Sequence, residues 1–152
     1  MKQLQNESLN KNSKVRLVLV GGCFDLLHYG HIRFLEDAKK LGDRLVVALE
    51  SDENVRRKKG DSRPIHTQAQ RKAMLEALSC VDEVIALPTM SSHQDYFDLV
   101  VRIGPSIIAI TQCDPVEANK RMQAAKIGAK LVVIPKVPTP STSQLAKLLG
   151  LE

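Results

Sequence analysis

Short apolar runs alternate along the chain with longer segments in which apolar residues recur at helical spacing. Continuous apolar runs are typical of strands buried on both faces of a parallel sheet, and helices between such strands cover the two faces. The alternation therefore predicts an α/β fold, a Rossmann-like doubly wound five-stranded parallel sheet with helices on both faces. The expected strands are residues 15–20, 44–50, 81–87, 107–110 and 131–134, and the expected helices begin close to Gly30, Ser51, Thr67, Ser92, Asp114 and Ser141.

The length of 152 residues is typical of a single domain. We expect residues 14–152 to form this domain and the polar residues 1–13 to be a flexible N-terminal tail. The tail lacks the apolar core of a secretory signal, and no apolar stretch is long enough to span a bilayer. A cytoplasmic location without membrane association is therefore expected.

The junction between the first expected strand and helix carries the strongest chemical signal. Gly21 and Gly22 permit a tight turn, and His28 and His31 lie on either side of Gly30 at the start of the helix. A helix N-terminus attracts phosphate, and positioned hydrogen-bond donors stabilise the charge that develops during phosphoryl or nucleotidyl transfer. Both histidines could instead be surface or capping residues, but their arrangement around a glycine favours the catalytic interpretation.

Polar residues also follow two later strands of the predicted sheet. Asp114 follows the fourth strand, and Ser141, Thr142 and Ser143 follow the fifth. Ligands of doubly wound sheets bind beyond the carboxyl ends of the strands at the switch point, so we expect these residues to lie near the two histidines. A row of hydroxyl residues is also a common helix N-cap, and both interpretations stay open for it.

Charge and missing motifs narrow the class of ligand. The net charge is +5, to which the basic run Arg56-Arg57-Lys58-Lys59 contributes, and aromatic residues make up only 3% of the chain. Few aromatic residues mean few stacking platforms for nucleic acid, so an anionic small molecule is expected instead. The dinucleotide fingerprint and the P-loop are both missing. The three widely spaced cysteines argue against a disulfide framework or a zinc site, and Cys23 is interpreted as a small buried residue.

Residues 22–31, Gly-Cys-Phe-Asp-Leu-Leu-His-Tyr-Gly-His, resemble the His-x-Gly-His signature of the cytidylyltransferase-like nucleotidyltransferases. The resemblance covers nearly the whole chain from about residue 15. It implies an enzyme that transfers a nucleoside monophosphate from a nucleoside triphosphate to a small phosphorylated acceptor and releases pyrophosphate. It also implies Mg²⁺ on the phosphates, no protein ligands to a metal, and a homodimer.

The resemblance further implies roles for individual residues. His28, His31 and Lys59 would be catalytic. Lys58, the neighbour of Lys59 in the basic run, and Arg71 would bind the phosphates of the substrate, and the choice between the two lysines stays open. The implied nucleotide-binding residues are Gly22, Cys23, Phe24, Asp25, Gly30, Asp114, Ser141, Thr142 and Ser143.

The identity of the nucleotide and the acceptor depends on shorter segments. Residues 59–64, Lys-Gly-Asp-Ser-Arg-Pro, resemble the heptose-phosphate adenylyltransferase domain of bacterial ADP-heptose synthesis, so ATP with a sugar phosphate such as heptose 1-phosphate is expected first. The alternatives are a glycerol 3-phosphate cytidylyltransferase, an FAD synthetase that adenylylates FMN, and a nucleotide-binding regulator without turnover. Two segments depart from the family pattern. Residues 111–114 lack the usual glycine before the acidic residue. Residues 136–140 lack the arginine that the glycerol-phosphate enzymes carry before the Ser-Thr turn.

Overall fold

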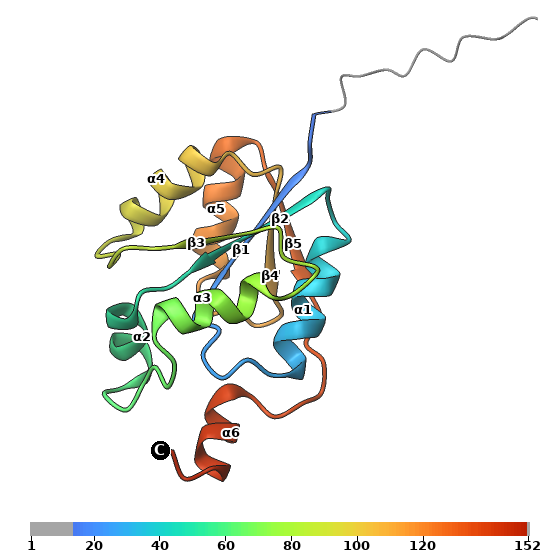
Figure 1. Ribbon diagram of the computed structural model, residues 1–152. Coiled ribbons are helices and arrows are strands. Elements are labelled where there is room, and N and C mark those ends of the chain that lie inside the picture. Colours follow the sequence, from blue (N-terminus) through green and yellow to red (C-terminus); the bar gives the residue numbers. More distant parts are fainter. Residues whose placement is uncertain (1–13, 152) are drawn as a thin grey trace, which may run out of the picture.

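Strands and helices alternate along the chain as the apolar pattern predicts (Figure 1). The computed structural model describes residues 14–151, and the expected tail at residues 1–13 lies outside this range. The five strands form one parallel sheet, which confirms the predicted Rossmann-like fold. Within residues 14–151 no helix is long and apolar enough to cross a membrane. The strands are β1 (Leu17–Gly22), β2 (Arg44–Leu49), β3 (Glu83–Ala86), β4 (Ile107–Thr111) and β5 (Lys130–Ile134), and the helices are α1 (Tyr29–Lys39), α2 (Asp52–Lys59), α3 (Gln68–Glu76), α4 (His93–Ile103), α5 (Glu117–Ile127) and α6 (Thr142–Leu148).

The order of the strands places the switch point of the sheet beside β1. The order is β3-β2-β1-β4-β5. The chain therefore runs outward from β1 to β3 and then crosses back to place β4 on the other side of β1. Ligands of such sheets bind beyond the carboxyl ends of the strands at this crossover. Here that position is the end of β1 that carries Gly21 and Gly22 and leads toward α1.

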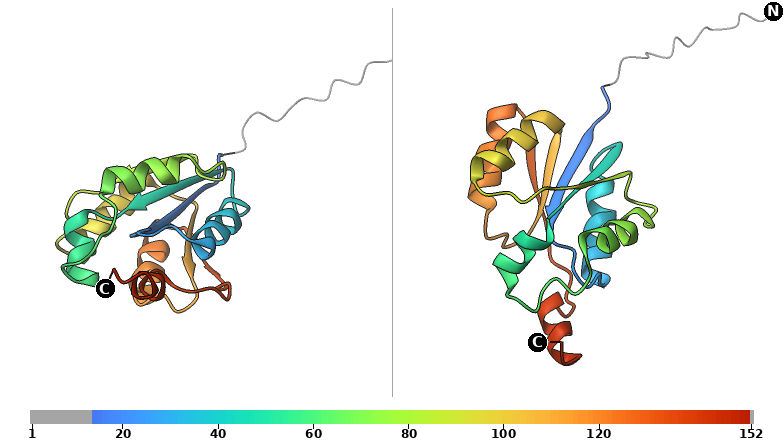
Figure 2. Two further views of the ribbon diagram at one scale, coloured as in Figure 1. Left: turned by 60° about the horizontal axis from the view of Figure 1, so that its bottom comes forward. Right: turned by 60° about the vertical axis from the view of Figure 1, so that its left-hand side comes forward.

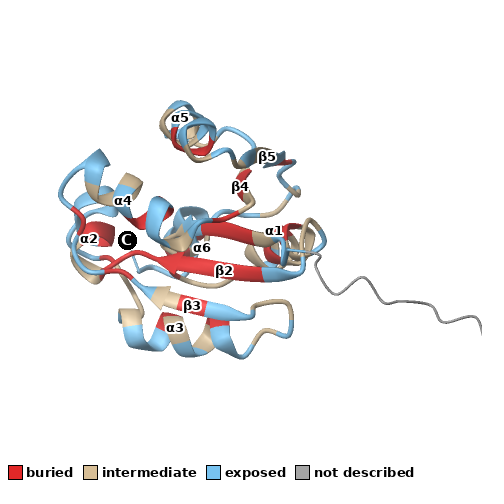
Figure 3. Cartoon of the chain, turned by 90° about the horizontal axis from the view of Figure 1, so that it is seen from above, coloured by how far each residue is buried: buried red, intermediate tan, exposed pale blue. Residues whose placement is uncertain are grey.

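Alternate side chains along β1 enter two separate cores, one on each face of the sheet. Val18 and Val20 belong to the core that includes residues of α1 and α3, whereas Leu19 belongs to the core that includes residues of α4 and α5. Figure 2 shows these two pairs of helices on opposite sides of the sheet, and Figure 3 shows β2 buried along most of its length. Burial on both faces explains why the strands are continuous apolar runs.

Several helices begin and end at the residues that favour caps. The Gln70 N–H donates to the Thr67 hydroxyl, and the Thr67 N–H donates to the Gln70 side chain, which is the expected capping box of α3. Ser92 and Ser141 cap α4 and α6 in the same way. Gly104 ends α4 with a φ of 61°, a left-handed conformation that glycine adopts without a steric penalty.

Three elements, β1, β3 and α5, have a boundary that differs by more than one residue from the expected one. β1 extends through Gly21 and Gly22, because both residues pair in parallel with β2. β3 is limited to Glu83–Ala86, the residues that lie opposite β2. α5 begins at Glu117 rather than at Asp114, because the Asp114 carboxylate closes a turn by accepting a hydrogen bond of 2.9 Å from the main chain two residues later.

Candidate active site

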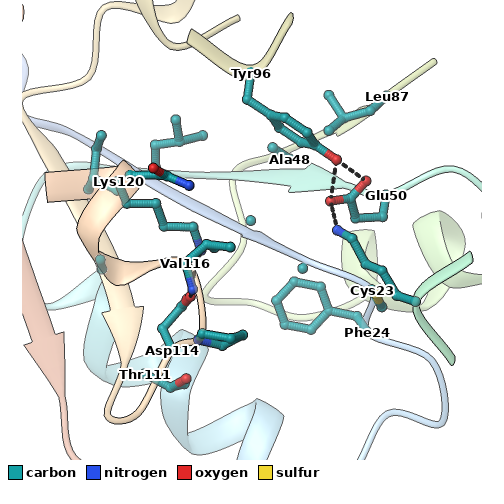
Figure 4. A pocket seen from close by; sticks show the side chains of 18 of the residues that line it. Cys23, Phe24, Ala48, Glu50, Leu87, Tyr96, Thr111, Asp114, Val116 and Lys120 are labelled. Carbon is teal, nitrogen blue, oxygen red and sulfur yellow. Dashed lines mark hydrogen bonds and ion pairs between the residues drawn. The ribbon is translucent and has the colours of Figure 1, made fainter. Parts of the chain in front are cut away.

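A pocket of about 540 Å³ lies at the carboxyl ends of β1, β2 and β4, with α4 and α5 on one side (Figure 4). This is the edge at which the topology predicts a ligand, and small-molecule sites have cavities of this size. The residues predicted for the site that line the pocket are Gly22, Cys23, Phe24, Asp25, His31, Lys58, Lys59, Asp114 and Thr142.

His28 and His31 are held by the first turn of α1. The Gly30 N–H donates to Nδ1 of His28 at 3.1 Å, and the His28 N–H donates to Nδ1 of His31 at 3.4 Å. A main-chain N–H can only donate, so each Nδ1 is an acceptor and each neutral ring carries its proton on Nε2. The two rings stack with their centroids 3.8 Å apart. Neither Nε2–H has a partner within residues 14–151, so both donors are available to an anion.

We expect the His31 ring to stay neutral in the ligand-free protein at physiological pH. Burial, with smaller effects of His28 and Lys59, lowers its pKa from 6.5 to about 3; burial and Lys59 also lower the pKa of His28. An NMR titration should show no protonation of His31 between about pH 5 and 8, and Lys59→Gln should raise the pKa of both rings.

Because the unfolded chain binds this proton below pH 6.5 and the folded chain does not, the folded state should lose stability as the pH falls through that range. A His31 midpoint near 6.5 would contradict the expected burial.

The Asp25 carboxylate joins the signature turn to the loop before α3. The residue is 1% exposed, and its carboxylate accepts hydrogen bonds from Nε of Arg63 at 2.7 Å and from the N–H groups of Ile65 and His66 at 2.9 and 3.1 Å. Burial tends to raise the pKa of Asp25, but these hydrogen bonds outweigh it and hold the pKa below the ordinary value. Asp25 therefore positions the turn, and its direct contact with a nucleotide stays a prediction.

Arg71 does not line the pocket, contrary to the phosphate-binding role that the resemblance implies. Its side chain is fully buried. The guanidinium donates to the carbonyl oxygens of Cys23 and Glu50 at 2.6 and 3.0 Å and to the Asp52 carboxylate at 2.7 Å. These bonds join the ends of β1 and β2 to the start of α2, so Arg71 has a structural role, and phosphate binding by Arg71 stays a prediction.

The two lysines at the end of α2 have different surroundings. Nζ of Lys58 lies 2.6 Å from Oε1 of Glu50. Lys59 lines the pocket and forms no ion pair with any residue in the 14–151 range. Its charge is close enough to lower the pKa of both His28 and His31. Lys59 therefore presents an available positive charge beside the histidines, and Lys58 does not.

Glu50 and Tyr96 form a wall of the pocket that the sequence reasoning missed (Figure 4). The Tyr96 hydroxyl lies 2.9 and 3.0 Å from the two carboxylate oxygens of Glu50. Glu50 directly follows β2, just as Asp114 comes shortly after β4, and this position at a strand end is the signal by which it could have been found. Tyr96 has no comparable signal, because it comes from α4, 46 residues further along the chain.

Asp114 lies on the other wall of the pocket (Figure 4). Its carboxylate is 2.8 Å from Nζ of Lys120, a further pocket residue that the sequence reasoning did not select. The preceding residue, Cys113, has a φ of 64°, in the left-handed region that favours glycine. The turn therefore keeps the backbone conformation of a glycine although the glycine itself is missing, and Asp114 still reaches the pocket.

The hydroxyl row at the start of α6 divides between capping and the pocket. Ser141 is the N-cap and accepts a hydrogen bond of 3.3 Å from the main chain three residues later. Thr142 lines the pocket, and Ser143 is exposed outside it. The loop before α6 packs closely on Gly30 of the His-x-Gly-His turn: a Cβ added at Gly30 would lie only 2.8 Å from Cγ2 of Thr139. Gly30 is thus needed for this contact, and phosphate binding by the row stays a prediction.

The fold and the pocket define a nucleotidyltransferase domain with its His-x-Gly-His turn at the switch point of the sheet. Residues 19–145 match the family model described as Cytidylyltransferase-like, and the chain belongs to this family. The resemblance carried by residues 22–31 is thereby confirmed.

Several proteins of known name or structure resemble the chain. The Bifunctional protein HldE of Haemophilus ducreyi is 50% identical over 128 residues, which are 78% of this chain and 26% of that protein. The protein of the same name from Hydrogenovibrio crunogenus is 46% identical over 93 residues, 61% of this chain and 18% of that protein, so the chain spans only a minor part of these curated relatives. The lipopolysaccharide core biosynthesis protein from Thermoplasma volcanium has a TM-score of 0.66 and 28% identity, over 84% of this chain and 100% of that one. The pantoate-beta-alanine ligase from Francisella tularensis shares the fold, with a TM-score of 0.59 and 15% identity over 86% of this chain and 63% of that one.

Proposed function

We propose that the chain transfers AMP from ATP to the phosphate of a sugar 1-phosphate, heptose 1-phosphate first, and releases pyrophosphate. The observation that carries the proposal is that His31, with His28 stacked on it, lies beside the unpaired Lys59 at a pocket large enough for a small phosphorylated molecule. The resemblance of residues 59–64 to the heptose-phosphate adenylyltransferases supports the acceptor. So does the 50% identity to a Bifunctional protein HldE.

The proposed reaction is a direct transfer. An oxygen of the acceptor phosphate attacks the α-phosphorus of ATP, a new P–O bond forms to the acceptor, and the bond to the pyrophosphate oxygen breaks. The Nε2–H groups of His28 and His31 and the Lys59 ammonium would donate to phosphate oxygens, on which negative charge increases in the transition state. Burial raises the pKa of the Cys23 thiol, which fits a transfer without a covalent cysteine intermediate.

Mg²⁺ belongs to the proposal as a companion of the nucleotide. In the part of the chain that the structure describes, no group of three or more His, Cys, Asp or Glu side chains could hold a metal ion. Mg²⁺ commonly binds through phosphate oxygens and water with only one or two carboxylates. The pocket therefore suits an ion that enters with the triphosphate, and such an ion would neutralise charge on the phosphates.

Lys59→Ala should lower kcat/KM by about tenfold or more, because it removes a charged hydrogen-bond donor to phosphate. Lys58→Ala should have a smaller effect, because the Lys58 ammonium is already paired with Glu50. Arg56→Ala and Arg57→Ala are the matched controls, since both arginines pair with an exposed glutamate of the same helix. Steady-state kinetics with ATP and heptose 1-phosphate measures all four. Equal and small losses at the four positions would indicate that the whole basic run is a solvated face.

Pyrophosphate release tests the proposed reaction. The panel crosses ATP, CTP, GTP and UTP with heptose 1-phosphate, glycerol 3-phosphate, FMN, phosphopantetheine and nicotinamide mononucleotide, all with Mg²⁺. We expect ATP with heptose 1-phosphate to give the fastest release. Preference for CTP with glycerol 3-phosphate, or for ATP with FMN, would replace the proposed substrates. Retained nucleotide binding with no release from any pair would instead indicate a regulator. The homodimer and the lack of nucleic-acid binding remain predictions.

A further inference from the structure

A buried carboxylate lines a pocket that has to accept phosphates. Glu50 is 6% exposed and lies on the pocket wall with Lys58 and Tyr96. A buried ion costs free energy unless it is paired and hydrogen-bonded, and a carboxylate beside a phosphate would repel it. The transfer chemistry does not use Glu50, so its position in the pocket calls for an explanation in terms of the ligand.

The hydrogen bonds of the protein leave part of this carboxylate unused. Lys58 donates to Oε1 at 2.6 Å, Asn54 donates to Oε2 at 3.1 Å, and the Tyr96 hydroxyl is within 3.0 Å of both oxygens. A carboxylate has about four acceptor positions, and a hydroxyl has only one proton to donate. Because the Tyr96 oxygen also accepts from Asn54 at 3.1 Å, its proton is directed to Glu50. About one acceptor position remains for a group of the ligand.

The charge of this wall differs from that of the histidine end. The Lys58 ammonium offsets the Glu50 carboxylate, so the wall presents an acceptor without a net positive charge. The part of the lining with His31 presents the Nε2–H of that ring and the unpaired Lys59, and the His28 ring stacks on His31 without lining the pocket. One part of the pocket lining thus suits an anion, and another part suits a neutral hydrogen-bond donor. A hydroxylated molecule with a phosphate at one end matches both.

We infer that Glu50, oriented by Tyr96 and Lys58, determines acceptor specificity by accepting a hydrogen bond from a hydroxyl group of the acceptor's sugar. The inference rests on the proposed function and adds to it the residue that recognises the sugar. Tyr96 and Lys58 act through Glu50, because their hydrogen bonds hold the carboxylate in one orientation at the pocket wall.

Glu50→Gln tests the inference, because the amide keeps the shape of the side chain and removes its charge. We expect KM for heptose 1-phosphate to rise by about tenfold or more, as for the loss of a hydrogen bond to a charged group. The Kd of a non-hydrolysable ATP analogue, measured by calorimetry, should not change. In the wild type, one monodeoxy analogue of heptose 1-phosphate should show a similar rise in KM. Glu50→Gln should add little to that rise, because both changes remove the same hydrogen bond.

Glu53→Gln is the matched control, since the Glu53 side chain is 45% exposed and pairs with arginines on the outer face of α2; its KM should equal that of the wild type. Tyr96→Phe keeps the ring, loses the donor to Glu50 and should raise KM less than Glu50→Gln does.

An unchanged KM in Glu50→Gln would overturn the inference and leave the proposed function standing. If the wild type releases no pyrophosphate with heptose 1-phosphate, the proposed function fails. Calorimetry of heptose 1-phosphate with the ATP analogue present then decides the inference by itself, because equal affinities of wild type and Glu50→Gln, or no binding to either, would refute it.

Discussion

His28→Ala and His31→Ala are each expected to lower kcat by about 10²–10³-fold, as for the loss of one positioned donor to a developing negative charge. Both rings accept a main-chain hydrogen bond at Nδ1, which leaves the Nε2–H groups to donate. Because the stacked rings are already oriented before the ligand binds, the stabilisation needs little reorganisation in the transition state. Pyrophosphate release with saturating ATP and acceptor measures the effect. Near-normal turnover in both variants would refute the catalytic role proposed for the two histidines.

His28→Ser separates the catalytic role of His28 from its structural one. His28 is the N-cap of α1, so His28→Ala should also lower the free energy of unfolding by about 1 kcal/mol. Serine is a favoured N-cap residue, so His28→Ser should recover most of that stability, but it has no Nε2–H and should remain as inactive as His28→Ala. Recovery of turnover together with stability would show that His28 only caps the helix.

Asp25→Asn is expected to lower the free energy of unfolding by about 3–5 kcal/mol, the usual cost of removing one partner from a buried ion pair. The side chains of Asp25 and Arg63 are both 0% exposed and lie 2.7 Å apart. The amide would remove the negative charge that pairs with Arg63 in the interior and would place an NH₂ group among main-chain donors. Urea unfolding followed by circular dichroism measures the change. Turnover should fall as well, because the same contact holds the signature turn against the loop before α3.

Glu83→Gln is the control for this variant, since Glu83 and Arg44 form an ion pair whose side chains are 44% and 50% exposed. Exposed pairs contribute about 0–1 kcal/mol, so the same chemical change should have little effect there. The pKa of Asp25 lies below its ordinary value of 3.8, so its stabilisation should be present at neutral pH and lost as the pH falls through the acid range below that value. Equal losses of unfolding free energy in the two variants would show that burial does not increase the contribution of the Asp25–Arg63 pair to stability.

Many features of the fold could be predicted because their causes are local in the sequence. An apolar run such as residues 44–50 suits a strand buried on both faces, and the spacing of Thr67 and Gln70 is enough for a capping box. The placement of His28 and His31 at the start of α1 likewise depends only on the glycine turn and the helical pattern beside them. The order of elements then brings Asp114 to the same edge of the sheet, since parallel strands share their carboxyl ends.

By itself, the sequence determined that the His-x-Gly-His turn stands at the switch point of a doubly wound sheet; the tertiary structure decided which charged groups remain available there. Lys58 and Lys59 are neighbours in sequence, but successive residues of a helix point about 100° apart, and only Lys58 meets Glu50. Arg71 looked like a phosphate ligand, yet it is bonded to a carbonyl group 48 residues away. Buried polar groups must find partners, and these partners come from distant segments that spacing along the chain does not reveal. Folding therefore directs the hydrogen bonds of Asp25 and Arg71 to other parts of the protein and leaves Lys59 and the Nε2 atoms of the two histidines without partners among residues 14–151.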